Sequence, residues 1–222
     1  VPEGVIRLEL DSSGELINST SLPEGLRQLS DTELEQALGR THRNCSSNQE
    51  WPIAINYASA SKILALCVEG QGLPPVELVM NVSSDMFAST RLLIVLEENA
   101  ELNLLQVILG SRNSALSHLI ESRLGEGSSL NHGLLALGSG NSSLIGNLGV
   151  EQLPGSKYSF TSVQQGWSIS QWETHLLQAE GNANSTISGL QISKGNEQLA
   201  THSTVRFNGP GGSLEQLQKA VA

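Results

Sequence analysis

Two cysteines, Cys45 and Cys67, could do chemistry, and we expect Cys45 to be the more accessible of the two. It lies in residues 41–50, a polar stretch without periodicity that we interpret as an exposed loop. Three basic residues precede it: Arg40, His42 and Arg43. Nearby positive charge lowers a thiol pKa, so Cys45 would be reactive if these side chains folded back toward the sulfur. A solvated free thiol on a loop is the simpler interpretation.

Cys67 lies near the end of the apolar run of residues 63–68, where a cysteine is usually a small buried hydrophobe. A sulfur-carrying or cluster-ligating role is the alternative, and it would need an exposed, electropositive setting. The chain has no CxxC motif and no histidine at zinc-finger spacing from either cysteine. The sequence therefore indicates neither a zinc site nor a disulfide framework, and a reducing, cytosolic location is expected.

Two histidines late in the chain have a spacing that could bring them together. His202 follows His175 at a spacing of 27, and Asn147 precedes His175 at a spacing of 28. If the chain coils with that period, all three fall in one file, and neighbouring imidazoles could share a metal ion. No third histidine or carboxylate joins them, so a polar ladder on the outer face is the alternative. We predict no catalytic, cofactor or metal residue, and retain only weak metal candidates: Cys45, Cys67, His175 and His202.

The elements that would position these residues form a repeat. Four short segments each place a small residue after a Gly or Asn that can adopt positive φ, as a tight turn into a strand requires. The small residues are spaced 28, 28 and 27 apart: Ala100, Ser128, Ser156 and Ala183. A second column has the same spacing: Leu116, Leu144, Trp172 and Leu199.

This period, with strand alternation and little helical pattern, is typical of a coil of strands. Each strand would pair in parallel with its counterpart one coil later, about 4.8 Å away. One interior file is expected to comprise Val76, Leu104, His132, Phe160 and Ile187. His132 would then be a core histidine with a satisfied ring nitrogen. The fold class is therefore mainly β, a parallel β-helix with a repeat of about 27 to 28 per coil.

The first part of the chain is mixed. Residues 5–10 alternate as a strand, and Ser30 with Glu33 forms a capping box that predicts a helix over 31–38. A second helix is expected over 51–60. We divide the chain into an N-terminal mixed segment, 1–60, and a β-helix core, 61–222. Five glutamates are expected mostly at turns as solubilising charges: Glu97, Glu98, Glu101, Glu121 and Glu126.

Composition and the absence of one motif argue against several classes of function. The 222 residues carry a formal net charge of −10, which opposes binding to nucleic acid or anionic lipid. The longest apolar run, residues 63–68, is too short to span a membrane. A phosphate-binding GxxxxGK[ST] loop is absent, so the chain is not expected to be an ATPase.

Several motifs together resemble the SufB/SufD core family of iron–sulfur cluster assembly, SufD more closely than SufB. They are Trp51-Pro-Ile-Ala-Ile-Asn-Tyr-Ala, Val68-Glu-Gly, Arg91-Leu-Leu-Ile-Val-Leu-Glu-Glu-Asn-Ala and Gly195-Asn-Glu-Gln-Leu-Ala-Thr-His-Ser-Thr-Val-Arg-Phe-Asn. The resemblance implies a right-handed β-helix flanked by helical segments. It also implies an accessory, non-enzymatic scaffold subunit that assembles with a SufB-like subunit and a SufC-like ATPase, with a homodimer also possible. A cluster would be held only by the complex, and not firmly by this chain.

The sequence departs from the family pattern at three places. Asn208 and its neighbours stand where a His is usual, and Ala200 replaces a common acidic residue. The family's C-terminal helical segment, which contacts the ATPase, is missing after Ala222, so a C-terminally truncated core is expected. The rival hypothesis is a secreted β-helix that binds or cleaves polysaccharide. It would need a cleft with aromatic stacking platforms, for which Trp167 and Trp172 are too few.

Overall fold

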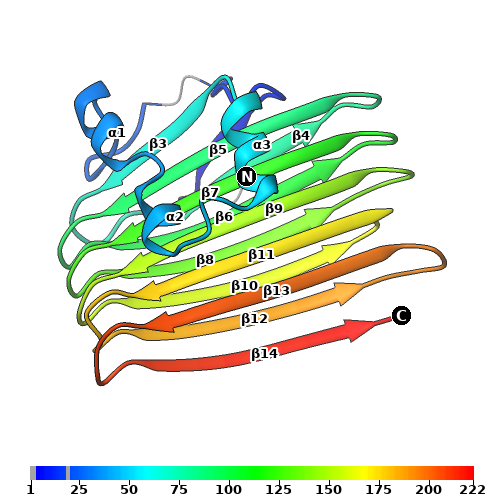
Figure 1. The fold of residues 1–222 in the computed structure, drawn as a ribbon. Coiled ribbons are helices and arrows are strands. Elements are labelled where there is room, and N and C mark those ends of the chain that lie inside the picture. Colours follow the sequence, from blue (N-terminus) through cyan, green and yellow to red (C-terminus); the bar gives the residue numbers. More distant parts are fainter. Residues whose placement is uncertain (1–3, 19–20) are drawn as a thin grey trace.

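The computed structural model describes residues 4–18 and 21–222, which wind into a solenoid of two facing sheets, both almost entirely parallel (Figure 1). Each coil contributes one strand to each sheet. The first sheet, sheet A, has the order β1 (Ile6–Leu10), β4 (Val76–Val82), β6 (Glu101–Gly110), β8 (Ser129–Leu137), β10 (Lys157–Gln165), β12 (Asn184–Ile192) and β14 (Ser213–Val221). The second, sheet B, has the order β13 (Gln198–Phe207), β11 (Ile169–Gln178), β9 (Ser143–Gln152), β7 (Ala115–Leu124), β5 (Phe87–Leu96), β3 (Ile63–Val68) and β2 (Leu26–Gln28). The predicted mainly-β coil is confirmed.

The predicted turns into sheet A are also confirmed. Asn99, Gly127, Gly155 and Asn182 all have positive φ, between 52° and 73°. The small residue that follows each of them is fully buried, so a larger side chain would not fit at the corner of the coil: Ala100, Ser128, Ser156 and Ala183.

The register of sheet A matches the predicted interior file. Val76 pairs with Leu104, Leu104 with His132, His132 with Phe160 and Phe160 with Ile187. All five side chains are buried in the space between the two sheets. The strand at residues 5–10 extends this file further, because Ile6 pairs with Val76.

The column predicted for sheet B is wrong at one position. Leu144 pairs with Ser170, not Trp172, and Ser170 pairs with Leu199. The cause is the connection between β10 and β11, which is two residues shorter than the preceding connection, between β8 and β9. The coil from Leu144 to Ser170 is therefore shorter than the repeat, and the coil from Ser170 to Leu199 is longer, so a fixed period fails.

The shortened turn is held by Trp167, whose side chain is fully buried. Its indole Nε1 donates a hydrogen bond of 3.1 Å to the carbonyl oxygen of Ala136. Glycine at 110 and 138 leaves room for the ring, because a Cβ at either position would lie within 2.6 Å of it. Neither Trp167 nor Trp172 is accessible, so neither can serve as a sugar-stacking platform.

Three short helices cover part of the outer face of sheet B (Figure 1). They are α1 (Asp31–Ala37), α2 (Arg40–Asn44) and α3 (Trp51–Ser59). The capping box of α1 is present as predicted, with Ser30 and Glu33 bonded reciprocally. The prediction of a polar loop over 41–50 is wrong for residues 41–44, which lie in α2, and is confirmed for residues 45–50, which form neither helix nor strand. Within residues 4–18 and 21–222, no helix has the length and apolarity to cross a bilayer.

The α2 helix approaches sheet B closely through His42, which is fully buried. The histidine sits above Gly149, where a Cβ would lie 2.9 Å from the ring carbon Cε1. Nε2 lies 3.2 Å from the carbonyl oxygen of Ile120, and Nδ1 lies 2.8 Å from the hydroxyl of Ser47. Since a carbonyl can only accept, Nε2 carries the proton and Ser47 donates to Nδ1. The sequence of α2 has no helical periodicity, so its contact with sheet B stabilises the helix.

Three histidines are buried in neutral form, and they make stability depend on pH. Burial lowers the pKa of His42, His118 and His132 from 6.5 to about 3 in each case. Between these values the unfolded chain binds more protons than the folded one, so stability is lost as pH falls from about 6.5 toward 3. Each histidine contributes a slope of up to about 1.4 kcal/mol per pH unit.

Replacing His132→Leu should therefore flatten the dependence of the unfolding free energy on pH, by roughly 1 kcal/mol per pH unit between about pH 6 and about pH 5. The measurement is urea unfolding across that range. The matched control is Phe160→Leu on the next rung, which should lower stability equally at each pH. An unchanged slope in His132→Leu would contradict the assignment of His132 as a buried neutral group.

Candidate metal centre

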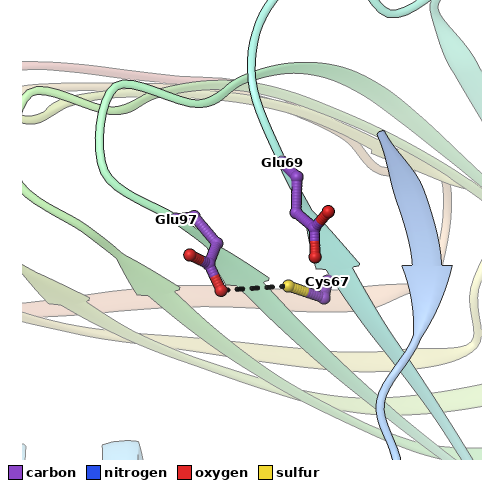
Figure 2. Close-up of side chains that lie close together, drawn as sticks. All are labelled: Cys67, Glu69 and Glu97. Carbon is purple, nitrogen blue, oxygen red and sulfur yellow. Dashed lines mark hydrogen bonds between the residues drawn. The ribbon is translucent and has the colours of Figure 1, made fainter. Parts of the chain in front are cut away.

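A thiol and two carboxylates meet at the edge of sheet B where β3 and β5 end (Figure 2). Cys67 lies on β3, and Glu69 is two positions further on, so both side chains emerge on the outer face of the sheet. Val68 pairs with Leu96, which places Glu97 beside Glu69 on the next coil. The parallel register thus stacks two carboxylates from successive coils against one sulfur.

The three groups are close enough to share a ligand. Their nearest ligand atoms all lie within 4.8 Å of one another, and Sγ of Cys67 lies 3.7 Å from Oε1 of Glu97. The thiol is the donor in this contact, since an ionised carboxylate can only accept. Cys67 is 1% exposed, whereas both glutamates are exposed. A soft thiol therefore lies at the base of a cleft whose rim carries carboxylates.

The charges around this cluster are unevenly compensated. Arg27 lies beside Cys67 across the β2–β3 pair, and its Nε bonds Oε1 of Glu69 at 2.6 Å. The same guanidinium pairs with Glu33, Nη2 to Oε1, at 2.9 Å. Among the residues that the structure describes, Glu97 has no basic partner in an ion pair, so its charge is the uncompensated one.

A cleft of about 170 Å³ opens beside the sulfur, between α1 and the sheet. Cys67 and Glu97 line it together with Leu29, Glu33, Gln36, Ala37, Arg40, Val95 and Arg123. Burial raises the pKa of the Cys67 thiol to about 11, against the opposing charge of Arg27 and with the charges of Glu97 and Glu69 acting in the same direction as burial. The thiol is therefore protonated near neutral pH unless a cation replaces the proton.

Cys45 lies elsewhere, and the expectation of a solvated thiol on an exposed loop is wrong. It is 5% exposed beneath the C-terminal end of α2, and its sulfur faces the carbonyl oxygens of Val150 and His175, each at 3.6 Å. Burial raises its pKa to about 12. The polar stretch around it folds down onto sheet B, which removes Cys45 from solvent.

His175 and His202 do not share a file, because the shortened coil shifts the register. His202 pairs with Glu173, which pairs in turn with Asn147. Nδ1 of His202 lies 3.0 Å from Oε1 of Glu173 on the outer face. His175 is buried under α2, with Nε2 3.3 Å from Oε2 of Glu50. The predicted pair of imidazoles on adjacent rungs is therefore wrong.

Sequence reasoning missed the partners of Cys67 and misplaced Glu121. Glu69 and Glu97 carried a usable signal, since they are one coil apart and Glu69 is two positions from the cysteine. Glu121 is not at a turn: it is fully buried on β7, and its Oε1 accepts from Nη2 of Arg91 at 2.8 Å. The alternation of β7 could not reveal this, because helices cover the face that would otherwise meet water.

These features define a class of protein, a two-sheet parallel β-solenoid with short helices packed on one sheet. Residues 79–222 match the family described as SUF system FeS cluster assembly, SufBD core domain. The chain belongs to this family, and the resemblance seen in its motifs is confirmed at that level. Comparison with curated proteins gave no match.

Proposed function

We propose that this chain is an accessory scaffold subunit, of the SufD type, within an iron–sulfur cluster assembly complex. Membership of the SufBD core family supports a role in SUF assembly. The scaffold role, the SufD type and the cytoplasmic location are our extension of it. On this proposal the chain performs no covalent chemistry, and any cluster is held by the complex as cargo. The partners are a SufB-like subunit and a SufC-like ATPase, and a homodimer is a further possible assembly.

The observation that supports a positional role best is the parallel pairing of successive coils in sheet A, which continues to its last described strand, β14. Within the described residues, β14 is paired with β12 alone. We infer that the partner continues this pairing by adding a strand of its own on the other side of β14. The backbone amide of Ser213 donates toward β12, to Ala183. Because successive residues point their amides to opposite sides, those of Gln216 and Gln218 face away from β12, toward the strand that the partner would add.

This geometry gives a sharp test of docking by strand addition. Gln218→Pro should remove an amide that faces the edge while leaving the hydrogen bonds to β12, as edge strands tolerate proline there. We expect capture of a co-expressed SufB-like subunit by the tagged chain to weaken by about tenfold or more, the equivalent of one lost hydrogen bond. The measurement is the amount of SufB-like subunit that co-purifies with the tagged chain, relative to the amount of SufC-like ATPase that co-purifies.

Gln218→Thr is the matched control, since it changes the same side chain and keeps the amide. It should retain the partner at the wild-type level. If both variants retain the partner equally, docking does not use this edge. If the chain purifies without either partner and binds glycans, the scaffold proposal is lost.

A further inference from the structure

We propose that Cys67, Glu69 and Glu97 form a binding site for a single thiophilic divalent cation of the Fe²⁺ or Zn²⁺ type. The proposal is a property of this chain alone and does not rest on the scaffold function. It departs from the sequence-based expectation that the chain itself holds no metal.

The spacing of the cluster suits a tetrahedral metal. Bonds of about 2.3 Å to sulfur and about 2.1 Å to a carboxylate oxygen place those two ligand atoms about 3.6 Å apart. Sγ of Cys67 and Oε1 of Glu97 are 3.7 Å apart, and Glu69 supplies a third ligand atom within 4.8 Å of both. Three protein ligands at an open cleft leave a fourth position for water or another ligand.

The burial of the sulfur is an independent pointer to a ligand. Cys67 is almost fully shielded from solvent, yet it lines the cleft, and among the described residues its thiol bonds only within the cluster. A cysteine that served only as core packing would sit among apolar side chains, as its interior-facing neighbours Leu66 and Val68 do. Here the sulfur instead faces two carboxylates.

Charge favours a divalent cation over a proton. With the thiol ionised, the three ligands carry three negative charges, and Arg27, which is shared with Glu33, offsets only part of them, so a divalent cation would be well compensated. Binding would replace the S–H bond by a sulfur–metal bond and release the proton to solvent. Glu97 lacks a basic partner among the described residues, and the bound cation would neutralise its charge.

The same surroundings select the kind of metal. Arg40 and Arg123 also line the cleft, and their charge opposes any cation held by ion pairing alone. Only a metal that bonds strongly to thiolate overcomes this repulsion, and such metals include Zn²⁺ and Fe²⁺ but not Mg²⁺ or Ca²⁺. The site is therefore expected to ignore excess magnesium.

Cobalt(II) titration of the full chain tests the proposal, because a cobalt–thiolate bond gives a near-ultraviolet charge-transfer band. We expect one Co²⁺ per chain, displaced by Zn²⁺ and unaffected by Mg²⁺.

Cys67→Ser should abolish the band, and the matched control Cys45→Ser, at the other buried thiol, should keep it. Glu97→Gln, at an exposed position, should weaken Co²⁺ binding by about tenfold or more without unfolding the chain. The proposal is overturned if no band forms at millimolar Co²⁺, if the band follows Cys45, or if Glu97→Gln binds as tightly as wild type. Co-purification with partners is unaffected by any of these outcomes, so the two proposals fail separately.

Discussion

Glu121→Ala should lower the free energy of unfolding by about 3–5 kcal/mol, because it leaves the Arg91 guanidinium buried without its counter-ion. The Glu121 and Arg91 side chains are 0% and 8% exposed and meet at 2.8 Å. Glu121 Oε1 also accepts the amide of Gly39 at 2.9 Å, and the Arg91 guanidinium lies 4.1 Å above the ring of Tyr57. The pair thus ties the residue preceding α2, and the helix α3, to β5 and β7.

Urea unfolding measures the loss of stability in Glu121→Ala, and two further variants test whether the buried unpaired charge causes it. Lys62→Ala removes an exposed partner of Glu15 at 3.8 Å, and should cost no more than about 1 kcal/mol. The double variant Arg91→Met with Glu121→Leu should be more stable than Glu121→Ala, because no buried charge remains. A loss below about 1 kcal/mol for Glu121→Ala would show that water reaches the guanidinium.

The sequence predicted the repeat because each coil must solve the same packing problem. A parallel coil returns equivalent residues to equivalent positions, so small residues such as Ala100 and Ser128 recur at its corner with little freedom to vary. Register in sheet A followed directly. The interior histidine was likewise predictable, since His132 falls in a file of apolar residues.

What the sequence could not predict lies where two coils, or a coil and a helix, meet. The shortening of the turn before β11 is invisible without knowing that Trp167 fills it. That shift separated His175 from His202 and placed His202 against Glu173. The fates of Cys45 and Glu121 depended on helices covering sheet B, a tertiary contact that local polarity in residues 41–50 concealed.

Only part of the candidate metal centre could be predicted from the sequence. The predicted burial of Cys67 is confirmed, and the proposed site adds carboxylates that the position of Cys67 in the chain does not reveal. The register of sheet B brings Glu97 from the next coil to its sulfur, and neither residue signals this alone. In a coil, a site is assembled from side chains one period apart, so each chemical residue should be compared with the positions one coil before and after it.

Trp172→Ala should cost about 3–5 kcal/mol, the range for removing a large aromatic side chain from a core. The ring is fully buried and stacks against Phe160 with centroids 6.2 Å apart. It fits because Gly146 faces it on the preceding coil, where a Cβ would lie 2.1 Å from Cε3. The exposed Trp51→Ala is the control for loss of an indole, and should change stability by about 0.5 kcal/mol or less.

The Gly146→Ala variant tests whether the ring of Trp172 packs directly against position 146. Alone it should cost about 1–3 kcal/mol by overpacking, since the added methyl meets the six-membered ring and not a flexible end. In the Trp172→Ala background that cost should vanish, because the methyl then enters the space the indole has left. The double-mutant cycle measured by urea unfolding should therefore give a coupling energy of about 1 kcal/mol or more. Additive losses would mean that the two residues do not face each other, and that the register across the shortened coil is misplaced.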